Sequence, residues 1–118
     1  MKFQRKIIHN WSKLNNILAN TAYPNSEKEI LKILKFAKAN RKKISMMGHG
    51  CSHGDVFYYN NENIVVNTTK FNKILEYNSD KQIITVQSGA SILKVNNFLF
   101  EKKNLIFVSQ IKCTLLFF

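Results

Sequence analysis

The chain has little proline, glycine, cysteine or acidic side chain: one proline, four glycines, two cysteines and seven Asp and Glu among 118 residues. The cysteines, Cys51 and Cys113, form no CxxC pair and indicate no disulfide framework. No apolar run approaches the length that spans a bilayer, and the basic N-terminus is not followed by the apolar stretch of a signal peptide. We therefore expect a cytoplasmic protein without a membrane span.

The shortage of acidic residues leaves a formal net charge of +11. Such a charge attracts polyanions, and the basic runs Lys2–Lys6, Arg41–Lys43 and Lys102–Lys103 could form a nucleic-acid footprint. However, these runs stand at the ends of separate expected elements, and the whole sequence favours Lys, Asn, Ile and Phe. A solvated basic surface is the simpler interpretation. A small basic module that binds nucleic acid or acidic surfaces remains the alternative function.

The clearest local signal is a helix that begins at Ser26. Ser26 and Glu29 have the spacing of a capping box, in which each side chain bonds the other's backbone amide. Asn40 can end this helix in the left-handed conformation. Apolar residues at helical spacing give the helix one face: Ile30, Ile33, Leu34 and Ala37.

Short β-branched segments predict strands on both sides of a glycine-rich stretch. A buried strand is expected at Lys43–Met47 and another at Ile64–Asn67. The segments Lys73–Tyr77 and Gln82–Gln87 predict a hairpin because they flank a turn-rich tetrad. A last strand is expected at Leu105–Val108.

A second helix is predicted after Ser91, with Ile92, Val95 and Leu99 on one face. Strands mixed with helices in this order indicate an α+β fold: a small mixed sheet with two packed helices. We divide the chain into a lead-in segment over residues 1–12, a domain over 13–109 and an apolar tail over 110–118 that looks unfinished. The tail ends in two leucines and two phenylalanines and predicts a tendency to associate.

Three of the four glycines lie in one loop, which directly follows the strand expected at Lys43–Met47. Glycine adopts backbone conformations that other residues reach only at a cost, so successive amides can converge on an anion, most often a phosphate. The loop residues are Gly48, His49, Gly50, Cys51, Ser52, His53, Gly54 and Asp55. Ser52 is suited to donate to a phosphate, and Asp55 to orient the loop or simply to form a turn.

Other interpretations of the loop stay open. It could be a tight surface turn, because short motifs often match by chance. Its alternating residues could also project to one side of a strand as zinc ligands: His49, Cys51, His53 and Asp55. Gly50 and Gly54 weaken such a strand, and ligands so closely spaced would be strained, so we expect no metal site. After the loop, Phe57, Tyr58 and Tyr59 could stack on a flat ligand or pack beneath the loop.

The stretch Met47–Asp55 resembles the pyrophosphate loop of FAD-linked oxidases of the vanillyl-alcohol oxidase type, which have a PCMH-type FAD-binding domain. Sugar-lactone oxidases and the decaprenylphosphoryl-ribose oxidase group are the most similar. Three further segments resemble family motifs in family order: Tyr23–Ile30, Asn67–Leu75 and Thr85–Ile92. Asn10-Trp11-Ser12 is similar to the family's tryptophan-containing segment before the domain. The resemblance covers about Trp11 to Val108.

This resemblance implies the N-terminal half of a PCMH-type domain that binds FAD in a flavin-dependent oxidoreductase acting on an alcohol group of a sugar or lactone. It implies FAD contacts from the loop and, nearby, from Thr68 and Gly89. No catalytic base is identified, because the family's substrate domain and second FAD segment have no match in this chain. We therefore expect a partial domain, cut short or read out of frame, that is inactive alone.

Cys51 departs from the family pattern. In lactone oxidases the matching position is a histidine that carries the flavin covalently, and in the decaprenylphosphoryl-ribose group it is an arginine without a covalent flavin. The resemblance therefore implies non-covalent FAD for this chain. Met47 is a second departure, since the family has a basic residue before the loop.

Overall fold

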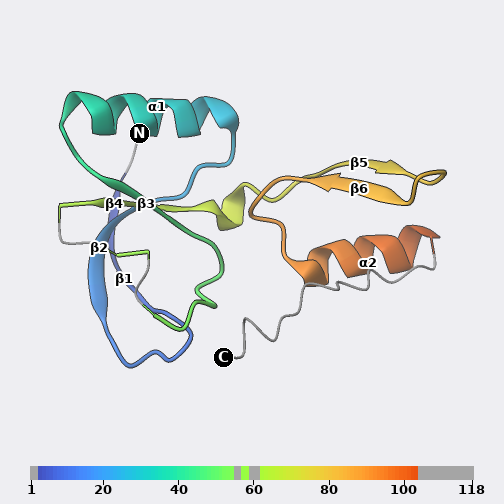
Figure 1. Cartoon of the computed structure of the whole chain (residues 1–118), viewed down its shortest axis with the longest axis horizontal. Helices are drawn as coiled ribbons and strands as arrows, with labels where there is room; N and C mark the ends of the chain where they lie inside the picture. Colours follow the sequence, from blue (N-terminus) through green and yellow to red (C-terminus); the bar gives the residue numbers. More distant parts are fainter. Residues whose placement is uncertain (1–2, 55–56, 59–61, 104–118) are drawn as a thin grey trace.

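The computed structural model describes residues 3–54, 57, 58 and 62–103. The expected α+β class is confirmed: a four-stranded sheet carries one helix, and a two-stranded hairpin lies beside a second helix (Figure 1). Within these residues no helix has the length and apolar character that a membrane crossing requires. The elements are β1 (Gln4–Ile8), β2 (Ile17–Ala22), α1 (Glu27–Ala39), β3 (Ile44–Met47), β4 (Ile64–Asn67), the 3-10 turn η1 (Thr68–Lys70), β5 (Ile74–Asn78), β6 (Ile83–Val86) and α2 (Ile92–Lys103).

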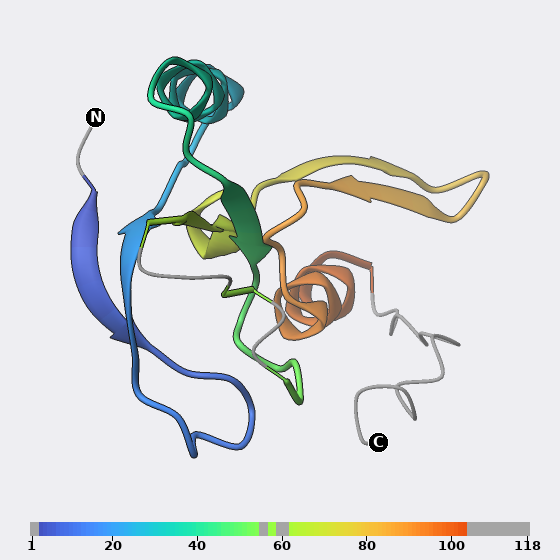
Figure 2. The same cartoon turned by 60° about the vertical axis from the view of Figure 1, so that its left-hand side comes forward.

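The four-stranded sheet has the order β1-β2-β4-β3. β1 is antiparallel to β2, whereas β4 is parallel to both β2 and β3. The chain runs from β2 through α1 to the far edge as β3 and then returns as β4 between them (Figure 2). β4 therefore has a neighbour on each side, and all four of its residues are buried. An uninterrupted apolar run such as Ile64-Val65-Val66 is typical of such a central strand.

Alternate residues of the sheet form two small cores, because successive side chains of a strand point to opposite faces. On one face, Ala22, Ile64 and Val66 pack against Ile33 and Ala37 of α1. The opposite face joins the buried side chains of Ile8, Ile17, Ala19, Phe57 and Val65.

The helix predicted from Ser26 is confirmed as α1, with differences at both caps. Ser26 Oγ accepts a hydrogen bond from the Glu29 amide, but the Glu29 carboxylate accepts from the Asn25 amide, 2.8 Å away. Asn40 is not left-handed, since its φ is −102°. The next residue, Arg41, takes that conformation with φ 52°, and Leu34 lies outside the buried face.

The predicted strand before the glycine loop exists, but the expectation that it is buried is wrong. β3 is an edge strand, and Met46 is 56% exposed, because β4 occupies the position between β3 and β2. The sequence prediction missed β1, which lies within the lead-in segment 1–12. Four of its five residues are exposed, so its sequence has no apolar alternation that marks a strand.

The predicted hairpin is confirmed as β5 and β6, which pair antiparallel. Ser91 caps α2 as expected, since its Oγ accepts a hydrogen bond from the Lys94 amide at 3.1 Å. Val95 and Leu99 are buried in α2, whereas Ile92 is 41% exposed. The strand predicted at Leu105–Val108 and the tail 110–118 lie outside the described residues.

Candidate functional site

The glycine loop begins where two parallel strands end together. Met47 of β3 and Asn67 of β4 are register partners, so the loop and η1 start at the same edge of the sheet. Asn67 Nδ2 donates a hydrogen bond to the Gly48 carbonyl oxygen at 3.3 Å. Thr68 Oγ1 donates to the Met47 carbonyl oxygen at 3.4 Å. The end of β4 therefore holds the start of the loop.

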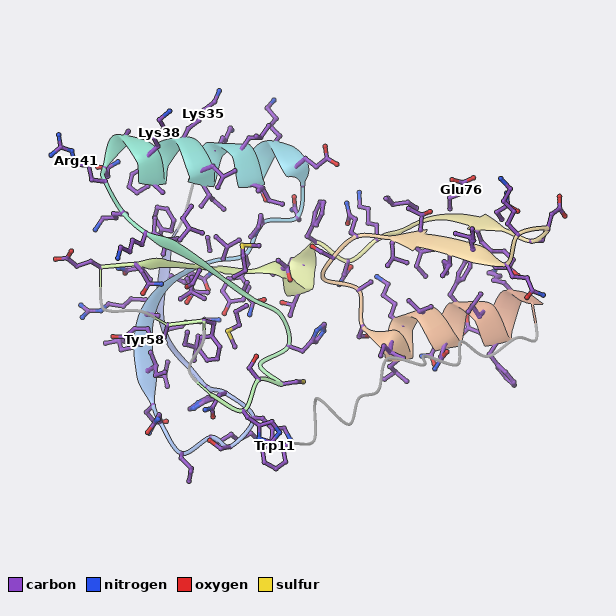
Figure 3. The ribbon with its side chains drawn as sticks, viewed as in Figure 1. Trp11, Lys35, Lys38, Arg41, Tyr58 and Glu76 are labelled. Atoms are coloured by element: carbon purple, nitrogen blue, oxygen red, sulfur yellow. The ribbon has the colours of Figure 1, made fainter. Side chains whose placement is uncertain are left out.

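The far side of the loop is held by the connection between β1 and β2. The Trp11 amide donates to the Ser52 carbonyl oxygen at 2.9 Å, and Asn10 Nδ2 donates to the His53 carbonyl oxygen at 2.9 Å. The Trp11 ring also lies against the His53 ring, with 4.9 Å between centroids. Trp11 stands at the end of the molecule opposite α1 (Figure 3).

These anchors use carbonyl groups of the loop and leave backbone amides available. The carbonyl oxygens of Gly48, Ser52 and His53 accept hydrogen bonds. Within the described part of the chain, no hydrogen bond is donated by the amides of His49, Gly50 or Cys51. Unpaired amides in a loop are the groups that bind phosphate oxygens.

Gly50 is the loop residue whose backbone requires glycine. Its φ is +78°, and a Cβ there would lie 3.0 Å from the His9 carbonyl oxygen and 3.1 Å from Met47 Cε. Gly48 is different, because a Cβ at Gly48 meets nothing within 4 Å. The close approach of Gly50 to His9 therefore fixes the course of the loop.

The loop residues differ in exposure. Gly48, His49, Cys51, His53 and Gly54 are exposed, while Gly50 and Ser52 are half-buried. Asp55 lies outside the described residues. Among the residues that the structure describes, no group of three or more His, Cys, Asp or Glu side chains could hold a metal ion.

Thr68 and Gly89, the two predicted contacts outside the loop, lie together. Thr68 is buried, and a Cβ on Gly89 would lie 1.7 Å from the Thr68 carbonyl oxygen. The Gly89 amide donates to the Phe71 carbonyl oxygen at 2.8 Å. Gly89 therefore provides close packing beneath η1, and its amide is already bonded.

Two hollows flank the loop. The smaller, of about 190 Å³, is lined by β3, the loop and Phe57. The larger, of about 420 Å³, lies between the loop and the β1 end of the sheet. Phe57 is buried in the core and Tyr58 packs half-buried against it, so both pack beneath the surface; Tyr59 lies outside the described residues.

Sequence reasoning assigned no role to Asn10 and Asn67, although both stand in segments that resemble family motifs. Both residues are 6% exposed, and their side-chain amides connect the loop to the β1–β2 connection and to the end of β4. The available signal for Asn67 was an asparagine at the end of an expected strand, because an amide that becomes buried there needs hydrogen-bond partners. His9 was also missed: its Nδ1 is buried without a hydrogen-bond partner in the described part of the chain.

Comparison with known sequences agrees with this arrangement. Residues 18–115 match the family described as FAD binding domain. The chain is also 29% identical over 101 residues to a D-arabinono-1,4-lactone oxidase from Candida glabrata. That match covers 81% of this chain but 19% of the relative, so the chain spans a small part of the relative's length.

Solved structures share the fold. A cholesterol oxidase from B. sterolicum matches with a TM-score of 0.72 at 19% identity, over 85% of this chain and 20% of that one. An alkyldihydroxyacetonephosphate synthase matches with a TM-score of 0.67 at 16% identity, over 83% of this chain and 20% of that one. At these identities the likeness concerns the fold.

Proposed function

Because this chain belongs to the FAD binding domain family, we propose that its glycine loop binds the pyrophosphate of FAD. The observation that carries the proposal is that the carbonyl groups and the amide groups of the loop have different partners. The carbonyl groups of Gly48, Ser52 and His53 hold the loop in place, whereas the amides of His49, Gly50 and Cys51 donate to no described residue. Oriented amides are partial positive charges at fixed positions, which suits a pyrophosphate.

The loop fits the group sterically as well. Gly50 has a positive φ and no side chain between the loop and His9, so the loop backbone can pack closely against His9 in the course that turns its amides outward for an anion. Ser52 is half-buried in the loop and supplies a hydroxyl donor. FAD held there would supply hydride-accepting chemistry, and the loop residues would bind and orient it.

We expect the flavin to be bound non-covalently. The resemblance implies a covalent bond through histidine at this position in lactone oxidases, and this chain has Cys51 there, with an exposed side chain. Flavin that is released when the protein is denatured in acid would support this expectation. Flavin fluorescence that stays with the denatured chain would contradict it.

For the complete activity we propose a flavin-dependent oxidoreductase that acts on an alcohol group of a sugar or lactone. The support is the similarity to a lactone oxidase, which extends over 19% of that relative. No described residue is assigned as a catalytic base, so this chain is proposed as the FAD-binding part. Binding of FAD is therefore the property to test first.

The test is a titration of the full chain with FAD, followed by flavin fluorescence at low and high salt. We expect saturation at one site that resists salt, since directed amide bonds are screened less than surface charges. Gly50→Ala should weaken binding about tenfold or more, because alanine is strained at positive φ. The matched control for the fold is Gly48→Ala, since its added methyl group meets no protein atom within 4 Å and should leave the stability of the chain like that of the parent.

FAD binding that modest salt abolishes, together with a Gly50→Ala variant that binds FAD like the parent, would contradict the loop assignment. If the chain also binds DNA or RNA, and salt weakens that binding as steeply as it weakens FAD binding, the basic-module alternative is favoured instead.

A further inference from the structure

The outer side of α1 carries basic and apolar side chains that have no part in the glycine loop. Residues three or four apart in a helix are neighbours on its surface, so two leucines lie among four lysines. All six side chains are exposed, and we call them the lysine face of α1: Lys28, Leu31, Lys32, Leu34, Lys35 and Lys38. Figure 3 shows Lys35 and Lys38 on the side of the helix that points away from the sheet.

The positive charge continues past the end of the helix, where Arg41 and Lys42 are exposed. The Arg41 amide donates a hydrogen bond to the Lys38 carbonyl oxygen at 3.3 Å. The Lys42 amide donates to the Ala37 carbonyl oxygen at 2.9 Å. These bonds close the last turn of α1, so the backbone of both cations is fixed relative to the helix.

Acidic side chains do not balance this charge. The sequence has no Asp or Glu between Glu29 and Asp55. The Glu29 carboxylate accepts a hydrogen bond from the Asn25 amide at the start of α1. Among the described residues, the lysines of the lysine face form no ion pair, and neither do Arg41 and Lys42. The lysine face therefore presents a positive potential that attracts an anionic surface.

Stabilisation of the helix explains only part of this arrangement. Cations near a helix C-terminus interact favourably with the helix dipole, which accounts for Lys38 and Arg41. Lys28 stands in the first turn, where the dipole is unfavourable for a cation. The dipole also gives no reason for Leu31 and Leu34, which are 56% and 47% exposed. These two leucines indicate a partner that offers apolar contacts together with negative charge.

Nucleic acid and an anionic membrane differ in this respect. Contacts to nucleic-acid phosphates are made by charged and polar groups, so Leu31 and Leu34 would add nothing to them. At a membrane surface, lysines are attracted to anionic lipids, and apolar side chains enter the boundary between headgroups and acyl chains. We propose that the lysine face of α1 binds the surface of a membrane that contains anionic lipids.

The position of α1 allows this binding without covering the glycine loop. α1 packs through Ile33 and Ala37 on one face of the sheet, whereas the core that includes Phe57 forms on the opposite face. Trp11, whose amide holds the loop, stands at the end of the molecule opposite α1 (Figure 3). A chain bound to a membrane through α1 therefore keeps its loop accessible, and the proposal does not depend on FAD binding.

The test measures how much of the full chain sediments with lipid vesicles. One set of vesicles is phosphatidylcholine alone, and the other also contains phosphatidylserine. We expect binding only to the vesicles with phosphatidylserine, weakened by salt because exposed charges are screened. Lys35→Gln/Lys38→Gln should weaken this binding about ten- to thirtyfold, since each cation near an anionic leaflet contributes about fivefold.

Two further variants separate the lysine face from net charge. The matched control is Lys73→Gln/Lys81→Gln, which lowers the net charge equally at two exposed positions, one before β5 and one in the turn before β6. This control should bind vesicles like the parent. Leu31→Ala keeps the charge and a good helix former, and it should weaken vesicle binding about three- to tenfold through the loss of apolar area.

Equal weakening by the two double lysine variants would show that net charge alone attracts the chain, and would overturn the proposal. Vesicle binding that Leu31→Ala leaves unchanged would also overturn it. A single-stranded RNA oligomer tests the other polyanion. RNA binding that is tighter than vesicle binding and is lost in Lys35→Gln/Lys38→Gln would assign the lysine face to nucleic acid instead. Gly50→Ala should bind vesicles like the parent, so this proposal and the FAD proposal can fail separately.

Discussion

Gly89 lies so close to Thr68 that a Cβ on Gly89 would be 1.7 Å from the Thr68 carbonyl oxygen and 2.6 Å from the carbonyl carbon. Gly89 follows the hairpin, whereas Thr68 begins η1 at the end of β4 and bonds the Met47 carbonyl at the start of the loop. The contact thus joins the hairpin and α2 to the part of the molecule that carries the loop.

Gly89→Ala should destabilise the fold strongly. The methyl group would collide with backbone atoms of Thr68 and Phe71, which cannot move as a flexible side chain does. Overpacking in a core costs about 1–3 kcal/mol, and we expect the upper end or more. Urea unfolding followed by circular dichroism measures the change, with Gly48→Ala as the control expected to match the parent. An unchanged midpoint for Gly89→Ala would refute this packing.

Asn10→Ala should lower both stability and FAD affinity. It removes the donor to the His53 carbonyl and the acceptor for the Lys13 amide, at a residue that is 6% exposed. Leaving buried partners unsatisfied costs about 1–3 kcal/mol. Denaturant unfolding and FAD titration on the same preparations measure the two effects.

Asn10→Asp separates the two bonds. Its carboxylate keeps an acceptor for the Lys13 amide but has no donor for the His53 carbonyl. We expect it to lose FAD affinity about as much as Asn10→Ala. If Asn10→Asp binds FAD as tightly as the parent does, the hydrogen bond from Asn10 to the His53 carbonyl does not position the loop.

The Cys51 thiol should become protected when FAD binds. Cys51 is exposed and lies in the loop, so a bound pyrophosphate would cover it. In a Cys113→Ser background, we expect a thiol reagent such as Ellman's to react readily with the free chain. The reaction should slow in proportion to the fraction of chain bound to FAD. A rate independent of FAD would place the flavin elsewhere.

Ser26→Ala should cost about 1 kcal/mol of stability, because the Ser26 hydroxyl accepts a hydrogen bond from the Glu29 amide at the start of α1. Ser26→Asp keeps an acceptor and adds favourable charge at the helix N-terminus, so it should retain the stability of the parent. Thermal or urea unfolding of the three proteins distinguishes them. Because α1 covers the sheet face opposite the Phe57 core, FAD affinity should change little in either variant.

The sequence alone determined the features that depend on neighbours along the chain. Helical spacing and the Ser26 cap predicted α1. The β-branched and aromatic residues around a turn-rich tetrad predicted the β5–β6 hairpin, and the clustered glycines predicted the loop. These signals are local, so they can be read from a few consecutive residues. The order of the motifs added the family, which the match over residues 18–115 confirms.

Only the tertiary structure decided which strands are neighbours and what holds the loop. β4 lies between β2 and β3, which makes β4 central and β3 an edge strand, and no local pattern specifies that pairing. The bonds from Asn10 and Trp11 to the loop join residues more than 40 positions apart. Lys6 and Lys70 likewise meet at Tyr23 only because the sheet brings their elements together. Such contacts depend on how the chain returns through space, and so they become visible only in the folded molecule.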